Sequence, residues 1–300
     1  MSRLLSCLVI FLSVIYTSCE HKPEAAKRFE PVFSTYESDS SSANTHIAKN
    51  EIHYGLLTPV EICEIFNRLG AAYSSTIMNP TSNRDLYLSS SKASINAGIY
   101  GVDLGYLKMF GAGQEMIEYM ISIQSLSGKL GIPENYITDP IKHIESDISD
   151  PDTVMSLMNT AYYRIENHLR EGGRESRAGL MVMGGWIEAM YIATQLIYDP
   201  ARPDPQVIQK IAEQKYTLTT LLSFLKNYYD DPVVVYYTKK LIFLKNYFDS
   251  FDIYFRKGDL EIDTVKQVFR SSGSEMTVTV HTLNEIRDYV KKLRTEIVEP

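Results

Sequence analysis

Cysteine is scarce in this sequence and recurrent metal-binding patterns are missing from it, and both absences restrict its chemistry. Its 300 residues include three cysteines, of which Cys7 and Cys19 lie within the first nineteen positions. Cys63 is then the single thiol of the part that we expect to fold, which excludes an internal disulfide framework there. No CxxC, HExxH or ExxH spacing occurs and the six histidines are scattered. The common zinc and di-iron sites are therefore not supported, and we expect no cofactor.

Positive charge is also in short supply. The chain has 30 Lys and Arg against 37 Asp and Glu, a formal net charge of -7. The densest basic run, Lys291, Lys292 and Arg294, lies on a helical pattern beside Glu296, and a solvated helix face explains it. Binding a phosphate backbone requires several cations on one face, so no nucleic-acid partner is expected.

The first nineteen residues, MSRLLSCLVIFLSVIYTSC, have the three parts of an export signal. Arg3 is the positive end, an apolar run at 4–15 follows, and two small residues precede Cys19. The run is shorter than the ~20 residues that span a bilayer, so we expect cleavage before Cys19 and acylation of its thiol and amine. The segment resembles a bacterial lipobox, although Tyr16 stands where such boxes usually carry Leu. Cleavage elsewhere is the alternative.

Composition predicts three regions: a lipoprotein signal peptide at 1–18, a lipid-anchored flexible tether at 19–50 and a single all-α domain at 51–300. Within the tether, 34–45 (STYESDSSSANT) is rich in serine and has too few large aliphatic residues to offset its ordering entropy. A flexible chain of ~30 residues spans roughly 30 Å. We therefore expect an outer-membrane lipoprotein of the cell envelope, facing either the periplasm or the exterior.

Helical signals continue almost without interruption after residue 58. They predict an all-α fold, either an antiparallel helical bundle or a TPR-like array of helix hairpins, with about eight or nine helices. The expected helices are 58–69, 89–110, 114–130, 134–147, 152–170, 174–198, 205–229, 232–255 and one that starts with the capping box at 282–285. Alternation at 276–281 predicts a strand that pairs with 260–269 in a small β-hairpin near 260–281.

Two of the expected helices carry small residues in register. Gly98, Gly101 and Gly105 form a stripe on one, and Gly185 and Ala189 continue a similar pattern on the other. Glycine inside a helix costs about 1 kcal/mol relative to alanine, so repeated glycines need a structural reason. Close packing of these two helices is that reason.

The segment 178–198 has two interpretations because it carries a single charge, Glu188. It is either the buried core helix of a soluble fold or a membrane-spanning helix. An acidic residue at the centre of a spanning helix costs about 2.5–3.5 kcal/mol, which favours the buried helix.

The same two helices carry the candidate chemistry. Asp103 and Glu188 lie among apolar neighbours, and Tyr106, Trp186 and Tyr191 are close to them in sequence. Buried carboxylates are protonated, paired with a base or bonded to hydroxyl groups, and perturbed acids also occur in binding sites. The favoured interpretation is a buried polar network that fixes how helices cross. A ligand pocket built from these five residues is the alternative.

Three segments carry a resemblance: 96–106 (NAGIYGVDLGY), 130–133 (LGIP) and 183–191 (MGGWIEAMY). Over roughly 58–200 the chain resembles a group of helical lipoproteins of Bacteroidota. The resemblance implies an all-α envelope protein. It implies no activity and no catalytic residue.

Three classes of function follow. A lipid-anchored, non-catalytic interaction or scaffold module is preferred, because helix pairs give broad surfaces and the 21 tyrosines include two Tyr-rich segments, 226–230 and 245–249. These segments are either a contact surface or helix ends with aromatic core anchors. The expected partners are the membrane, through the N-terminal lipid, and an envelope protein. A small-ligand binder with an acidic pocket at Asp103 and Glu188 is the second class. An enzyme, limited to carboxylate acid–base chemistry, is the third.

Overall fold

The computed structural model describes residues 59–139, 151–255, 260–263, 268–271 and 274–299. All of them lie in the second of the two units into which the chain divides, Thr45–Pro300. The predicted signal peptide at 1–18, the lipidation site Cys19 and the predicted tether at 19–50 lie outside the described residues. Most of the predicted helix at 134–147 does so too, although 135–139 are helical.

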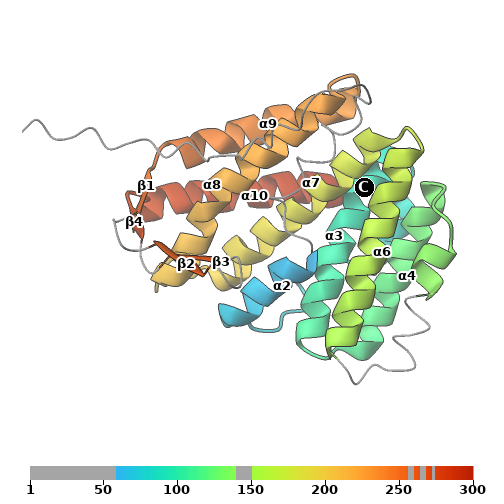
Figure 1. Cartoon of the computed structure of the whole chain (residues 1–300), viewed down its shortest axis with the longest axis horizontal. Coiled ribbons are helices and arrows are strands. Elements are labelled where there is room, and N and C mark those ends of the chain that lie inside the picture. Colours follow the sequence, from blue (N-terminus) through green and yellow to red (C-terminus); the bar gives the residue numbers. More distant parts are fainter. Residues whose placement is uncertain (1–58, 140–150, 256–259, 264–267, 272–273, 300) are drawn as a thin grey trace, which may run out of the picture. The chain divides into compact units, whose positions relative to one another are not determined.

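The described part of the chain is mostly helical, which confirms the predicted all-α class (Figure 1). Its longer helices are α2 (Pro59–Arg68), α3 (Ser90–Met109), α4 (Gly113–Lys129), α6 (Pro151–Glu171), α7 (Glu175–Ile192), α8 (Pro205–Leu225), α9 (Pro232–Asp249) and α10 (Val280–Val298). Its shorter ones are η2 (Thr81–Leu86), the π-helical turn η3 (Ala193–Ile197) after α7, and η4 (Lys226–Tyr228) after α8.

Capping residues and glycines set several helix ends. The side chain of Ser89 accepts a hydrogen bond from the first turn of α3. Asp204 and Asp231 do the same for α8 and α9, and each is followed by proline at the start of the helix. After α3 and α4 the chain turns at Gly111 and Gly131, whose φ angles of 65° and 63° suit glycine.

Helices α3 and α7 cross with their backbones in direct contact. A Cβ atom added to Gly98 of α3 would lie 1.9 Å from the carbonyl oxygen of Met181, and one added to Gly184 of α7 would lie 2.0 Å from that of Ile95. Both distances are far below van der Waals contact, so only glycine fits at these two positions. This close approach confirms the packing role that the glycine spacing predicts.

The apolar core forms two clusters that share α3 and α7. One cluster gathers residues of α7, α8, α9 and α10, among them the fully buried Phe248 and Ile286. The other gathers residues of α2, α3, α4 and α6, including Tyr100 and Leu169. Because α3 and α7 contribute to both clusters, their crossing connects the two halves of the core.

The segment 175–197 is the one helix of the described residues that is long and apolar enough to cross a membrane by length and composition. Within its most apolar window, 72% of the helix is buried inside the fold. Burial of this kind is typical of the core helix of a soluble unit and supports that interpretation of 178–198.

The region after α9 differs from the prediction. The expected helix at 232–255 ends at Asp249, and Ile253–Phe255 forms strand β1, which pairs antiparallel with β4 (Ser274–Met276). Strand β2 (Leu260–Asp263) pairs with β3 (Val268–Ser271), so a small β-hairpin lies within 260–281 as predicted. The predicted pairing of 260–269 with 276–281 is wrong, because the strands have other partners. Next to this pairing, the backbone N–H of Asp252 donates to the Thr277 hydroxyl at 2.8 Å, and the backbone N–H of Thr277 donates to the carbonyl oxygen of Asp252 at 3.1 Å.

The predicted strand at 276–281 is also misplaced, because β4 ends at Met276 and α10 already begins at Val280. The Thr279 hydroxyl accepts a hydrogen bond of 3.1 Å from the backbone N–H of Thr282, which makes Thr279 the N-cap. The helix therefore starts before the capping box at 282–285. Here a local cap outweighs the strand preference of alternating Thr and Val.

We expect Gly98→Ala to destabilise the fold although alanine is the better helix former. The added methyl group meets backbone rather than a movable side chain, so we expect a loss of about 1–3 kcal/mol in the free energy of unfolding. The matched control is Gly128→Ala in α4, where a Cβ atom would meet nothing within 4 Å. This control should gain about 0.5–1 kcal/mol from helix propensity. Urea unfolding of both variants measures the difference, and equal effects would contradict the prediction.

Candidate functional site

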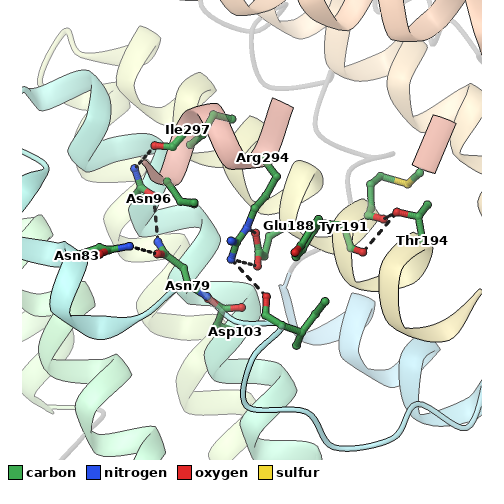
Figure 2. A network of polar contacts seen from close by, with 12 residues as sticks. Asn79, Asn83, Asn96, Asp103, Glu188, Tyr191, Thr194, Arg294 and Ile297 are labelled. Carbon is green, nitrogen blue, oxygen red and sulfur yellow. Dashed lines mark hydrogen bonds and ion pairs between the residues drawn. The ribbon is translucent and has the colours of Figure 1, made fainter. Parts of the chain in front are cut away.

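A buried ion pair joins α7 to α10. The Glu188 carboxylate accepts two hydrogen bonds of 2.9 Å from Nε and Nη2 of Arg294 (Figure 2). Glu188 is fully buried and Arg294 is 7% exposed. This two-point geometry is the strongest arrangement for an arginine and a carboxylate, and it fixes both side chains.

Further contacts surround the guanidinium of Arg294. Nη2 also lies 3.4 Å from the carbonyl oxygen of Ile77, and Cζ lies 4.6 Å from the centre of the Tyr191 ring. Burial alone would lower the pKa of Arg294, but the charge and hydrogen bonds of Glu188 raise it above its usual value. The guanidinium is therefore permanently charged, and the Tyr191 ring gives it a cation–π contact.

Asp103 of α3 is fully buried beside this ion pair (Figure 2). Its Oδ2 accepts a hydrogen bond of 3.0 Å from the backbone N–H of Asn79, whereas no donor among the described residues reaches Oδ1. Burial raises the pKa of Asp103 well above its usual value, and the charge of Glu188 raises it further, while Arg294 acts in the opposite direction. This environment favours the neutral acid.

Asn79 is the centre of a second group of hydrogen bonds. Its Nδ2 donates to the Tyr87 hydroxyl at 3.0 Å and to Asn96 Oδ1 at 3.2 Å, while its Oδ1 accepts from Asn83 at 3.1 Å. The Tyr87 hydroxyl in turn lies 3.0 Å from the carbonyl oxygen of Val298. Asn79 thus connects the irregular segment before α3 to α3 itself and to the last turn of α10.

Tyrosine hydroxyls hold the same irregular segment from the other side. Tyr100 of α3 donates to the carbonyl oxygen of Pro80 at 2.9 Å, and Tyr119 of α4 donates to that of Asn79 at 3.0 Å. Burial raises the pKa of both hydroxyls above the usual value for tyrosine, so they remain protonated donors. The backbone of this segment is therefore bonded on several sides.

Three of the five predicted site residues lie together. Asp103, Glu188 and Tyr191 surround Arg294, as the buried-network interpretation expects (Figure 2). Glu188 binds the guanidinium, Tyr191 contacts it with the face of its ring, and Asp103 accepts from the backbone of Asn79.

The other two predicted residues lie in separate surroundings. The Tyr106 hydroxyl donates to the carbonyl oxygen of Ala72 at 2.6 Å and takes no part in the ion pair. The Trp186 indole N–H donates to Gln214 at 3.1 Å, and its ring lines an apolar groove between α2, α7 and α8. Cys19, the predicted lipidation site, lies outside the described residues.

Arg294 is the principal residue that sequence reasoning missed. The basic run at Lys291, Lys292 and Arg294 was assigned to a solvated helix face, and for Arg294 this is wrong. A signal was available, because Arg294 lies four residues after Val290 and three before Ile297, both on the apolar side of α10. An arginine on an apolar helix face indicates a buried acidic partner.

Asn79 was missed for a different reason. It lies in the irregular segment between α2 and α3, where neither helical nor strand periodicity places a side chain. Its partners come from positions as distant as the end of α10 through Tyr87. The central position of Asn79 among these hydrogen bonds therefore follows from tertiary structure alone.

The charged groups of the network have their interaction partners within the protein. Glu188 has a bidentate partner, Asp103 is held in a setting that favours its neutral form, and the hydroxyls of Tyr100 and Tyr119 are committed to backbone carbonyls. In the part of the chain that the structure describes, no group of three or more His, Cys, Asp or Glu is arranged to hold a metal ion. Comparisons with protein-family models, curated proteins and solved structures give no match to this chain.

We expect Asp103→Asn to raise stability at neutral pH. The unfolded chain releases the Asp103 proton near the usual pKa of 3.8, while the folded state retains it to higher pH, so wild-type stability falls as pH rises through that window. The amide keeps the neutral shape and removes this dependence. Urea unfolding at about pH 4 and about pH 7 should give equal stabilities at the lower pH and a more stable variant at the higher. The exposed Asp230→Asn is the control, and a variant destabilised at both pH values would contradict the prediction.

Proposed function

We propose that this chain is a lipid-anchored cell-envelope protein whose helical unit is a non-catalytic interaction module. The export signal and Cys19 support the anchor. The satisfied network around Glu188 and Arg294 supports a structural role for the buried charges, because neither group is available to a substrate.

An exposed aromatic surface on α9 and α10 carries the proposal. We define this aromatic surface by Tyr236, Lys240, Phe243 and Tyr247 of α9 and Tyr289 of α10. Tyr236 and Phe243 are 49% and 50% exposed. The Phe243 ring lies 5.6 Å from the Tyr247 ring and 5.1 Å from the Tyr289 ring, and Lys240 Nζ lies 4.8 Å from the Tyr236 ring.

Aromatic residues grouped in this way are the typical anchors of protein interfaces. Tyrosine and tryptophan contribute most strongly to binding energy, and they combine apolar area with a polar tip. The Tyr289 hydroxyl donates to the Lys240 carbonyl at 3.1 Å, so the ring is already fixed before any partner arrives. Preordered rings lose little side-chain entropy on binding.

Each of the two Tyr-rich segments, 226–230 and 245–249, has residues suited to both roles considered for it, a contact surface and a core anchor. In 226–230, Tyr228 is buried in the core while Tyr229 is exposed. In 245–249, Phe248 is buried and Tyr247 contributes to the aromatic surface. Each segment therefore supplies one core anchor and one outward aromatic ring.

The small-ligand alternative around Asp103 and Glu188 has less support. Glu188 is occupied by Arg294, and Asp103 accepts from the backbone of Asn79. A ligand at this position would have to displace an ion pair whose separation leaves a buried charge, which costs about 3–5 kcal/mol. The same cost disfavours acid–base catalysis by Glu188.

The anchor is tested with Cys19→Ser in the native host. We expect the variant to move from the membrane fraction to the soluble fraction, because it lacks the acyl chains. Its circular dichroism and melting temperature should match those of the wild type, since Cys19 precedes all described helices. A variant that stays on the membrane would contradict the proposed anchor.

The interaction role is tested by native mass spectrometry of the full chain after gentle extraction from its own envelope. We expect a second polypeptide or a second copy of the chain, and we expect Phe243→Ala to reduce its occupancy about tenfold or more. The matched control is Leu88→Ala, which changes an exposed aliphatic residue outside the aromatic surface. A bare monomer from cells treated with a cross-linker, or equal losses in both variants, would contradict the proposal.

A further inference from the structure

A groove between α2, α7 and α8 stands apart from both the buried network and the aromatic surface. It is an open groove rather than a closed cavity, and the space of about 640 Å³ along it includes open solvent at its mouth. From α7 it is lined by Val182, Trp186, Ala189 and Ala193, which recur at helical spacing on one side of the helix. The lining is therefore a continuous strip of α7 side chains rather than a gap at a helix end.

The other two walls are equally regular. α2 contributes Ile65, Phe66 and Leu69, and α8 contributes a strip that runs from Val207 to Thr217. Ten residues of helix extend about 15 Å, and the strip on α7 has a similar length. The strips on α7 and α8, with the shorter strip on α2, make an elongated and largely apolar trough, which suits an extended hydrocarbon chain.

Polar groups are confined to the α8 wall. Lys210 and Gln214 lie one turn apart there, and the Gln214 amide oxygen accepts a hydrogen bond of 3.1 Å from the Trp186 indole. Lys210 Nζ lies 2.7 Å from Glu213, an exposed pair that contributes only ~0–1 kcal/mol and is easily exchanged. Glu213 keeps a second partner, Gln209 at 2.9 Å, when Lys210 turns to a ligand.

We propose that this groove binds a free fatty acid, with the hydrocarbon chain along α2 and α7 and the carboxylate at Lys210. The apolar walls account for the chain, and Lys210, the one charged residue among the described residues of the lining, accounts for the anionic head. An uncharged hydrocarbon would make no ionic contact with Lys210. A compact polar molecule would leave most of the apolar walls exposed to water.

Trp186 provides a direct reporter, because it is the single tryptophan of the chain and its ring lines the groove. We titrate the full chain carrying Cys19→Ser with dodecanoate below its micelle concentration and follow tryptophan emission. We expect a saturable change. Octanoate lacks four methylene groups and should bind about two hundredfold more weakly when all four are buried in the longer chain. Dodecanamide should also bind more weakly, because it has no charge.

Two variants test the two halves of the site. Lys210→Glu reverses the charge at the rim and should weaken dodecanoate binding by about fivefold or more without affecting folding, since Lys210 is exposed. Lys226→Glu changes an exposed lysine outside the groove and should bind as the parent chain does. Ala193→Phe fills the trough and should abolish the response while preserving the melting temperature.

The outcomes separate the possible occupants. A linear or absent response in the parent chain, or equal losses in Lys210→Glu and Lys226→Glu, would overturn the proposal. The acylated wild-type chain in vesicles is titrated in parallel. If it fails to respond while the Cys19→Ser chain responds, the protein's own acyl group occupies the groove and the assignment to a free fatty acid is wrong. A response in both chains supports the proposal.

Discussion

Direct contact between the backbones of α3 and α7 is the constraint on which the other features depend. At Gly98 and Gly184 no side chain separates the helices, so the groups that follow by about one turn, Asp103 and Glu188, are held in the same buried layer. Two carboxyl groups in one apolar layer require compensation. Proton retention by Asp103 supplies one part, and Arg294 from α10 supplies the other. The position of α10 thus follows from how closely α3 and α7 approach.

The polar network also makes an irregular segment part of the core. Residues between α2 and α3 have no helical hydrogen bonds of their own over much of their length, and a buried backbone needs partners. The hydroxyls of Tyr100 and Tyr119 and the carboxyl group of Asp103 provide them. Arg294 of α10 adds a contact of 3.4 Å to the carbonyl oxygen of Ile77. Removing one hydroxyl would leave a buried carbonyl group without its donor, which costs about 1–3 kcal/mol. Order in this segment therefore comes from α3, α4 and α10 rather than from its own sequence.

Local signals in the sequence predict the helices well. Of the site they predict the residues on α3 and α7, Asp103, Glu188 and Tyr191, but not Arg294 or Asn79. Capping residues, glycine ends and the glycine stripe depend on neighbours in sequence or on one packing partner, so 89–110 and 114–130 match α3 and α4 closely. The predicted strand pairing is wrong because the choice of partner strand depends on tertiary contacts and not on the alternation within one strand. The predicted exposure of Arg294 is wrong because its place on the apolar face of α10, and not the basic residues next to it in sequence, decides where its side chain lies. Asn79 had no local signal, since its partners belong to distant elements.

The ion pair between Glu188 and Arg294 spans 106 residues of sequence, and this separation bears on biogenesis. A chain made from its N-terminus has α3 and α7 available long before α10 exists. During that interval the Glu188 carboxylate has no cation to neutralise it, so a tightly packed crossing carries a large desolvation penalty. Tight packing of this crossing is therefore favoured only after α10 has been made. If the chain is exported as we propose, this delay would keep it open for passage through an export channel.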